Sequence, residues 1–113
     1  MKHKVAKCRH DALEACCSIV EFTKGSTFES YEKDKLLRSA VERQFEILGE
    51  AFNRLEGMDE SFRERLPDIG AIIGMRNRII HGYDTVDNSI VWDAVQLHIP
   101  ELVKWLENKE GLD

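Results

Sequence analysis

One long segment, residues 34–56, constrains the fold of this chain more than any other. Six side chains lie along one stripe at helical spacing, and all except the glutamine are apolar: Leu37, Val41, Gln44, Leu48, Phe52 and Leu55. Four more widen that stripe beyond a single packing seam: Leu36, Ala40, Ile47 and Ala51. A helix that is apolar over more than half of its circumference must be covered on two sides. The covering elements are either other helices of this chain or a second copy of it.

Two shorter helical segments are predicted on either side of this long helix. Residues 3–24 carry apolar side chains at every third or fourth position: Val5, Cys8, Ala12, Ala15, Ile19 and Phe22. This spacing predicts an amphipathic helix. The following GSTFES is expected to be a connection with Phe28 in the core. Ser61 and Glu64 have capping-box spacing, so residues 61–66 are predicted to form a short helix, which Pro67 is expected to stop.

Two further helices complete the prediction. Residues 68–80 begin with Asp68 as the N-cap and end before Gly82, which is expected to take the left-handed conformation common beyond helices. Asp87 caps a last helix to about residue 108, in which Pro100 introduces a kink or interrupts a hydrogen bond. Their expected inward positions are Ile69, Ile72, Ile73, Ile80, Ile90, Ala94, Leu97, Leu102 and Trp105. No segment alternates like a strand, so the predicted fold is all-α, an antiparallel bundle of four to five helices.

The overall composition is that of one domain spanning residues 1–113. No apolar run approaches the roughly 18 residues needed to cross a membrane. The start, MKHKVAKCRHD, lacks the apolar run of a signal peptide, and the odd number of cysteines fits reduced thiols. We therefore expect a cytoplasmic protein. A net charge of −5 argues against broad capture of nucleic acid, but it leaves room for a local basic site.

Polar side chains concentrate in residues 74–84, GMRNRIIHGYD. The guanidinium of Arg76 suits phosphate oxygens, and His81 can move a proton near neutral pH. Asn77 precedes His81 by one helical turn, so its amide can hydrogen-bond the imidazole and fix its tautomer. Five positions separate Arg76 from His81, or about 140° around an unbroken helix. The two would therefore converge only if the last turn loosens near Gly82.

This set of residues suits a phosphodiester, although a second interpretation remains open. In that interpretation Arg76 and Arg78 are solvated charges and His81 is a satisfied residue at a helix end. Asp84 and Asp87 alone do not make a carboxylate cage, so neither a metal nor another cofactor is expected.

Other polar residues are assigned to packing or solvent. His3, His10 and His98 have no matching partners in the sequence. Glu46 and Glu50 share a helix face, for which two interpretations are open: the lining of a cleft, or a solvated face paired with Arg54. The second is favoured.

The order Gly74-Met75-Arg76-Asn77, three residues, His81, one residue, Tyr83 resembles the signature of the HepT-like branch of the HEPN superfamily. AVERQFEILGEAFNRL, residues 40–55, is similar to the long second helix of that family. GSTFESYEKDK and VDNSIVWDAV also match its pattern, so the resemblance covers nearly the whole chain. One departure is LPDIGAIIG, where the family usually has a tryptophan ahead of the motif helix.

The resemblance implies a homodimeric HEPN-like bundle that cleaves RNA without a metal ion. Arg76 and His81 would be catalytic: a ribose 2′-hydroxyl attacks the adjoining phosphate, His81 acts as acid or base, and Arg76 steadies the phosphorane. Asn77 would orient the imidazole. The family further implies the toxin of a type VII toxin–antitoxin module, whose partner is a minimal nucleotidyltransferase antitoxin. That partner would silence the toxin by transferring AMP from ATP to Tyr83.

Each chain supplies one such histidine, whereas this cleavage benefits from both a base and an acid. A two-fold dimer with both motifs in one cleft would supply both, and a larger hetero-oligomer of this dimer with the antitoxin is left open. One alternative concerns Tyr83, which would be an aromatic side chain packed against the final helix. Two others concern the whole protein. It would be a non-catalytic subunit that presents nucleotide or substrate to the nucleotidyltransferase, an interpretation that the acidic charge favours, or it would be a purely structural dimer.

Overall fold

The computed structural model describes residues 2–66, 68–82 and 86–108, and within these ranges it contains helices and no strands. In chain order the elements are α1 (Lys2–Thr23), α2 (Phe28–Lys33), α3 (Lys35–Met58), α4 (Phe62–Arg65), α5 (Ile69–His81), α6 (Asn88–Asp93), the π-helical segment η1 (Ala94–His98) and α7 (Ile99–Glu107). The predicted all-α bundle is confirmed.

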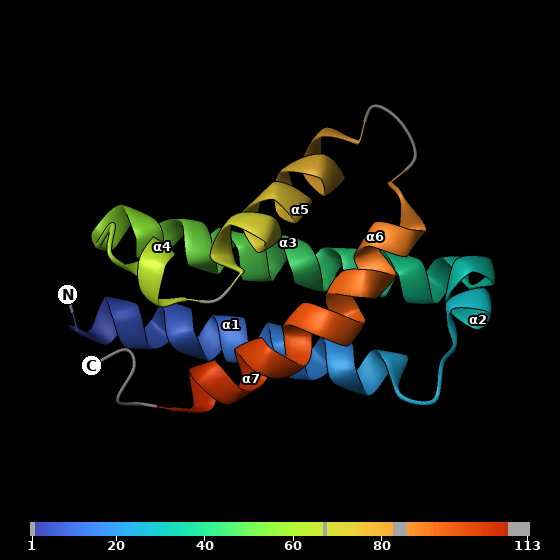
Figure 1. The fold of residues 1–113 in the computed structure, drawn as a ribbon, viewed down its shortest axis with the longest axis horizontal. Coiled ribbons are helices and arrows are strands. Elements are labelled where there is room, and N and C mark those ends of the chain that lie inside the picture. The colour runs from blue at the N-terminus through green and yellow to red at the C-terminus, as the bar shows by residue number, and fades with distance from the viewer. Residues whose placement is uncertain (1, 67, 83–85, 109–113) are drawn as a thin grey trace.

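The two longest helices, α1 and α3, lie side by side and run antiparallel (Figure 1). The short helix α2 joins them at one end of the molecule. The continuous rod α6–η1–α7 crosses the pair and packs along α1, whereas α5 packs on α3 and rises away from the bundle toward its own C-terminal end. None of the helices in the described part of the chain has the length and apolar character needed to cross a membrane.

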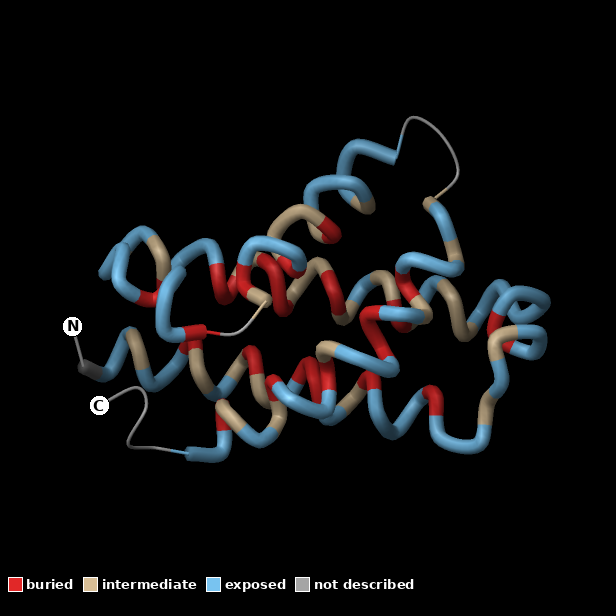
Figure 2. Tube along the Cα trace, viewed as in Figure 1, coloured by how far each residue is buried: buried red, intermediate tan, exposed pale blue. Residues whose placement is uncertain are grey.

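The wide apolar face of α3 is covered on two sides, as predicted, and both covers come from the same chain. α1 packs on one side of α3 and α5 on the other. Figure 2 shows the buried residues gathered between these helices. Five of the largest buried side chains belong to α3: Val41, Phe45, Leu48, Phe52 and Leu55. Because α5 covers the second flank, that flank is no argument for a second copy of the chain. Leu36, at the start of the helix, is 82% exposed.

The connection after α1 differs from the prediction because it contains a helix. Thr27 and Ser30 form a reciprocal capping box at the start of α2, a pattern that local sequence favours. The side chain that this helix buries is Tyr31, whose ring lies 5.3 Å from that of Trp92, whereas Phe28 is only partly buried. Phe22, expected on the inner face of α1, is exposed.

Two predicted caps are wrong. The Ser61 side chain makes no capping hydrogen bond; its backbone N–H instead donates to Oδ1 of Asp59 at 2.9 Å. Asp68 does precede α5, but its side chain does not cap it. The backbone of Asp68 is left-handed (φ 61°), and its Oδ2 lies 2.7 Å from Nδ1 of His98. His98, which was predicted to lack a partner, therefore ties the start of α5 to the C-terminal rod.

The ends of the last two helices are partly as predicted. Asp87 does cap α6, because its Oδ1 accepts the backbone N–H of Ser89 at 2.9 Å. Gly82 is not left-handed (φ −18°); its N–H donates to the carbonyl of Ile79. The stop expected from Pro67 lies outside the described residues.

Pro100 disturbs the last helix without a break in the rod. Proline has no N–H and crowds the preceding turn, and the segment just before it, η1, is π-helical. Ile90 and Leu97, both predicted to face inward, are exposed, and Val91 and Val95 are buried instead. Ile90 lies before the π-helical segment, so the inward face of the rod is already offset from the predicted one in α6. Ala94 and Leu102 are buried as predicted, and Trp105 is partly buried.

Candidate functional site

A groove of about 380 Å³ lies where α1, α3 and α5 meet. Its charged lining consists of three arginines and three carboxylates: Asp11, Arg43, Glu46, Glu50, Arg54 and Arg76. Ile80, which was predicted to be buried, is 47% exposed and lines the same groove one turn beyond Arg76. The groove thus contains the arginine that the sequence identified as the phosphate ligand.

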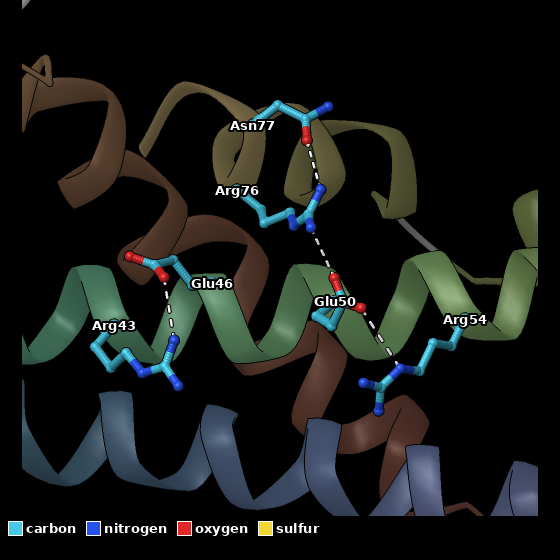
Figure 3. Close-up of polar contacts among 6 residues, drawn as sticks. All are labelled: Arg43, Glu46, Glu50, Arg54, Arg76 and Asn77. Atoms are coloured by element: carbon cyan, nitrogen blue, oxygen red, sulfur yellow. Dashed lines mark hydrogen bonds and ion pairs between the residues drawn. The ribbon is translucent and has the colours of Figure 1, made fainter. Parts of the chain in front are cut away.

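Contacts on several sides fix the Arg76 side chain, which is 25% exposed. Its Nη2 donates to Oε2 of Glu50 at 2.7 Å, and its Nη1 donates to Oδ1 of Asn77 at 2.9 Å (Figure 3). Its Nε is buried, with no hydrogen-bond acceptor among the described residues. Charge-assisted hydrogen bonds of this length are the stronger kind, so the guanidinium plane is held in one orientation.

The stem of Arg76 rests against Gly49 of α3. A Cβ built on Gly49 would lie 2.3 Å from Cβ of Arg76 and 2.8 Å from its Cγ. No ordinary packing contact is that short, so only glycine lets α3 and α5 approach this closely. The sequence placed Arg76 on its own helix, but the period of that helix does not determine that Gly49 lies beneath it.

Glu50 bridges two arginines. While Oε2 accepts from Arg76, Oε1 lies 3.5 Å from Nε of Arg54, one turn further along α3. The predicted pairing of Glu50 with Arg54 is confirmed, but Glu46 and Glu50 also line the groove, which was the less favoured of the two interpretations. The contact of Glu50 with Arg76 is a second one that the sequence did not reveal. Glu46, one turn earlier, pairs instead with Arg43 at 3.1 Å (Figure 3).

His81 is the last residue of α5 and is exposed. The helix stays α-helical through His81, so the loosening expected in its last turn does not occur before Gly82. Regular helical geometry then leaves the His81 and Arg76 side chains about 140° apart around α5. Among the described residues, those that line the groove include Ile80 but not His81. Within one chain, therefore, the groove contains Arg76 without His81.

Asn77 lies between these two residues in the sequence and is exposed. Its side-chain oxygen accepts from Arg76, and helical spacing places it on the same face as His81. Because an amide has an oxygen acceptor and a separate nitrogen donor, Asn77 can in principle serve both residues. Tyr83 and Asp84 lie outside the described residues. The described residues also contain no group of three or more His, Cys, Asp or Glu side chains arranged to hold a metal ion.

Comparison with known proteins gives the family. A family model described as "Ribonuclease HepT-like" matches residues 12–108. The chain is 32% identical over 108 residues to "Putative RNase MJ1380" of Methanocaldococcus jannaschii, covering 94% of this chain and 96% of that protein. It is 36% identical over 94 residues to "Probable ribonuclease HepT" of Thermococcus cleftensis, covering 81% of this chain and 83% of that protein.

A third relative is "Putative RNase TTE0752" of Caldanaerobacter subterraneus, 37% identical over 94 residues and 81% of each chain. No solved structure gives a significant match. The family match spans all of α3 and α5, and with them Gly49, Glu50, Arg76, Asn77 and His81. The chain therefore belongs to the HepT-like ribonuclease family.

Proposed function

We propose that this ribonuclease is a metal-independent endoribonuclease and the toxin of a type VII toxin–antitoxin module, active in the cytoplasm as a homodimer. The observation that carries this proposal is the fixed guanidinium of Arg76 in the groove between α3 and α5, on the helix that ends with His81. A rigid guanidinium stabilises the charge that develops on a phosphate in the transition state and needs no reorganisation when the reaction occurs.

The proposed reaction is an internal transfer at one phosphodiester. The ribose 2′-oxygen forms a bond to phosphorus as its proton passes to a base, and the bond from phosphorus to the 5′-oxygen breaks as that oxygen receives a proton from an acid. The products are a 2′,3′-cyclic phosphate and a 5′-hydroxyl. His81 is the proton carrier and Arg76 stabilises the phosphorane. Asn77 holds Arg76 through its oxygen and has an amide nitrogen for the imidazole of His81.

A second copy of the chain is part of the proposal for a geometric reason. On the unbroken helix α5, Arg76 and His81 point about 140° apart, and each chain has one histidine in this motif. A two-fold axis beside α5 would place the imidazole of one chain near the guanidinium of its partner, and would provide both an acid and a base. The antitoxin, a minimal nucleotidyltransferase, would add to this dimer to form a larger hetero-oligomer.

Expression without the antitoxin tests the toxin function. We expect arrest of cell growth, and we expect the purified protein to cleave RNA in the presence of EDTA, leaving 2′,3′-cyclic phosphate ends that end-group analysis detects. RNA that stays intact, or cleavage that EDTA abolishes, would contradict the proposal. A protein that binds nucleotide with its partner but leaves RNA intact would instead be the non-catalytic subunit.

Silencing is proposed to occur at Tyr83. The tyrosine oxygen would attack the α-phosphorus of ATP on the nucleotidyltransferase, forming Tyr-O-AMP and releasing pyrophosphate. The attached group adds bulk and negative charge two residues from His81, where it would repel the phosphate of RNA.

Intact-mass spectrometry after incubation with the antitoxin and ATP tests this step. The mass should rise by whole adenylyl groups while RNA cleavage falls. Tyr83→Phe should show no added mass and should stay active in the presence of the antitoxin. An unchanged mass of the natural protein, or an adenylylated Tyr83→Phe variant, would overturn this role.

A further inference from the structure

We propose that Glu50 is a positioning residue of this ribonuclease. Glu50 affects RNA cleavage only through the Arg76 side chain that it holds. In this role its carboxylate holds the Arg76 guanidinium toward the scissile phosphate, and Arg54 keeps the local charge positive. The inference rests on the proposed function and adds to it a residue from a different helix, 26 positions away in the sequence.

The first step of the argument is that Arg76 needs a tether. Arginine has a long side chain with several freely rotating bonds, so its fork takes many positions unless contacts select one. Gly49 restrains only the first carbons of the stem, and Asn77 holds only Nη1. Glu50 is the contact on Nη2, at 2.7 Å, and is the shortest of the hydrogen bonds made by this side chain. Together the three contacts define both the path of the stem and the plane of the fork.

The second step concerns charge. A lone carboxylate beside Arg76 would cancel the positive charge that an RNA phosphate must meet. Glu50 also pairs with Arg54, through its other oxygen, so that the group of three carries a net charge of plus one. The contact with Arg54 is longer, 3.5 Å, and more exposed than the contact with Arg76. The other charges of the groove are paired, Glu46 with Arg43 and Asp11 with Lys7. The carboxylate of Glu50 can therefore fix the guanidinium while its group of three still offers one positive charge to an anion.

The chain contains a matched control for this role. Glu46 lies on the same helix, one turn before Glu50, and lines the same groove, but it pairs with Arg43 rather than Arg76. Glu46→Gln removes the same charge from the same face as Glu50→Gln. A general electrostatic effect on RNA binding would therefore appear in both of these variants, whereas a loss of positioning should appear only when the acceptor itself is removed, as in Glu50→Ala.

Steady-state cleavage of an RNA oligonucleotide by the full-length protein tests the proposal. Glu50→Ala should lower kcat about 10- to 100-fold, because a small displacement of a catalytic group has effects of this size, with little change in KM. Glu50→Gln keeps an oxygen acceptor for Nη2 and should recover most of that loss. Glu46→Gln should leave kcat within about twofold of the natural protein.

A double-mutant cycle separates positioning from a merely structural effect. If Glu50 acts through Arg76, adding Glu50→Ala to Arg76→Ala should change kcat less than about twofold. Three results would overturn the proposal. They are an equal loss from Glu50→Ala in the natural and Arg76→Ala backgrounds, a loss in Glu46→Gln as large as that in Glu50→Ala, and a gain of activity in Glu50→Ala. A gain would mean that Glu50 competes with the phosphate.

A readout that does not require activity separates this inference from the proposed function. The Nε–H of Arg76 is buried, so its NMR signal should exchange slowly with solvent in the natural protein. The signal should exchange faster in Glu50→Ala and stay slow in Glu46→Gln. Slow exchange that persists in Glu50→Ala would overturn the positioning role, even in an active enzyme. If exchange is faster in Glu50→Ala but the natural protein does not cleave RNA, the hold of Glu50 on Arg76 is supported and only the ribonuclease mechanism is refuted.

Discussion

Gly49→Ala should lower RNA cleavage about 100-fold and reduce the free energy of unfolding by about 1–3 kcal/mol. The added Cβ would lie 2.3 Å from Cβ of Arg76. That atom is bonded directly to the α5 backbone, so no rotation of the arginine side chain removes the clash. α5 must move away from α3, and Arg76 with it, out of reach of Glu50.

Gly57→Ala is the control for this substitution. Gly57 lies in the same helix, and a Cβ there would meet nothing within 4 Å. Alanine is the better helix former, so this variant should keep full activity and be as stable as the natural protein or more stable by up to about 1 kcal/mol. Urea denaturation and initial cleavage rates measure both variants. Full activity in Gly49→Ala would show that the close approach of α3 and α5 does not position the site.

His81→Ala should abolish growth arrest and lower the cleavage rate about 10²- to 10⁴-fold, the usual contribution of a general acid or base. His81 is exposed at the end of α5, so its loss should leave the unfolding transition nearly unchanged. An inactive protein that is still fully folded would then assign the loss to chemistry.

The matched control is His10→Ala. His10 is also exposed and pairs with Glu14 within α1. Cleavage rates and growth should be those of the natural protein. If His81→Ala keeps more than about a tenth of the natural rate, another group carries the proton and the proposed mechanism fails.

The parts of the fold that follow from local spacing were predictable. The apolar periods of α1 and α3 and the cap at Asp87 each depend on residues close together in the sequence, and the structure confirms them. The pair of Asp68 and His98 joins residues 30 positions apart, so no local pattern could reveal it. The π-helical turn before Pro100 was anticipated only as a disturbance, because its form depends on how the C-terminal rod packs.

In the candidate site, too, the residues that were predictable lie close together in the sequence, and the others depend on contacts between helices. Chemistry and family resemblance identified Arg76, Asn77 and His81, which lie within one short segment. The roles of Gly49 and Glu50 depend on the register of α3 against α5, which the period of neither helix determines. One available signal was Gly49 itself, because a glycine inside a helix costs about 1 kcal/mol relative to alanine and so points to a packing reason for its presence.

Mixing the natural protein with His81→Ala chains tests most directly whether two copies share one catalytic cleft. The two forms are unfolded and refolded together, at a fixed amount of natural chain and increasing amounts of the variant. If each cleft needs histidines from both chains, the cleavage rate per natural chain should fall in proportion to the natural fraction, about tenfold when one chain in ten is natural. A rate per natural chain that stays constant across the mixtures would contradict the shared cleft.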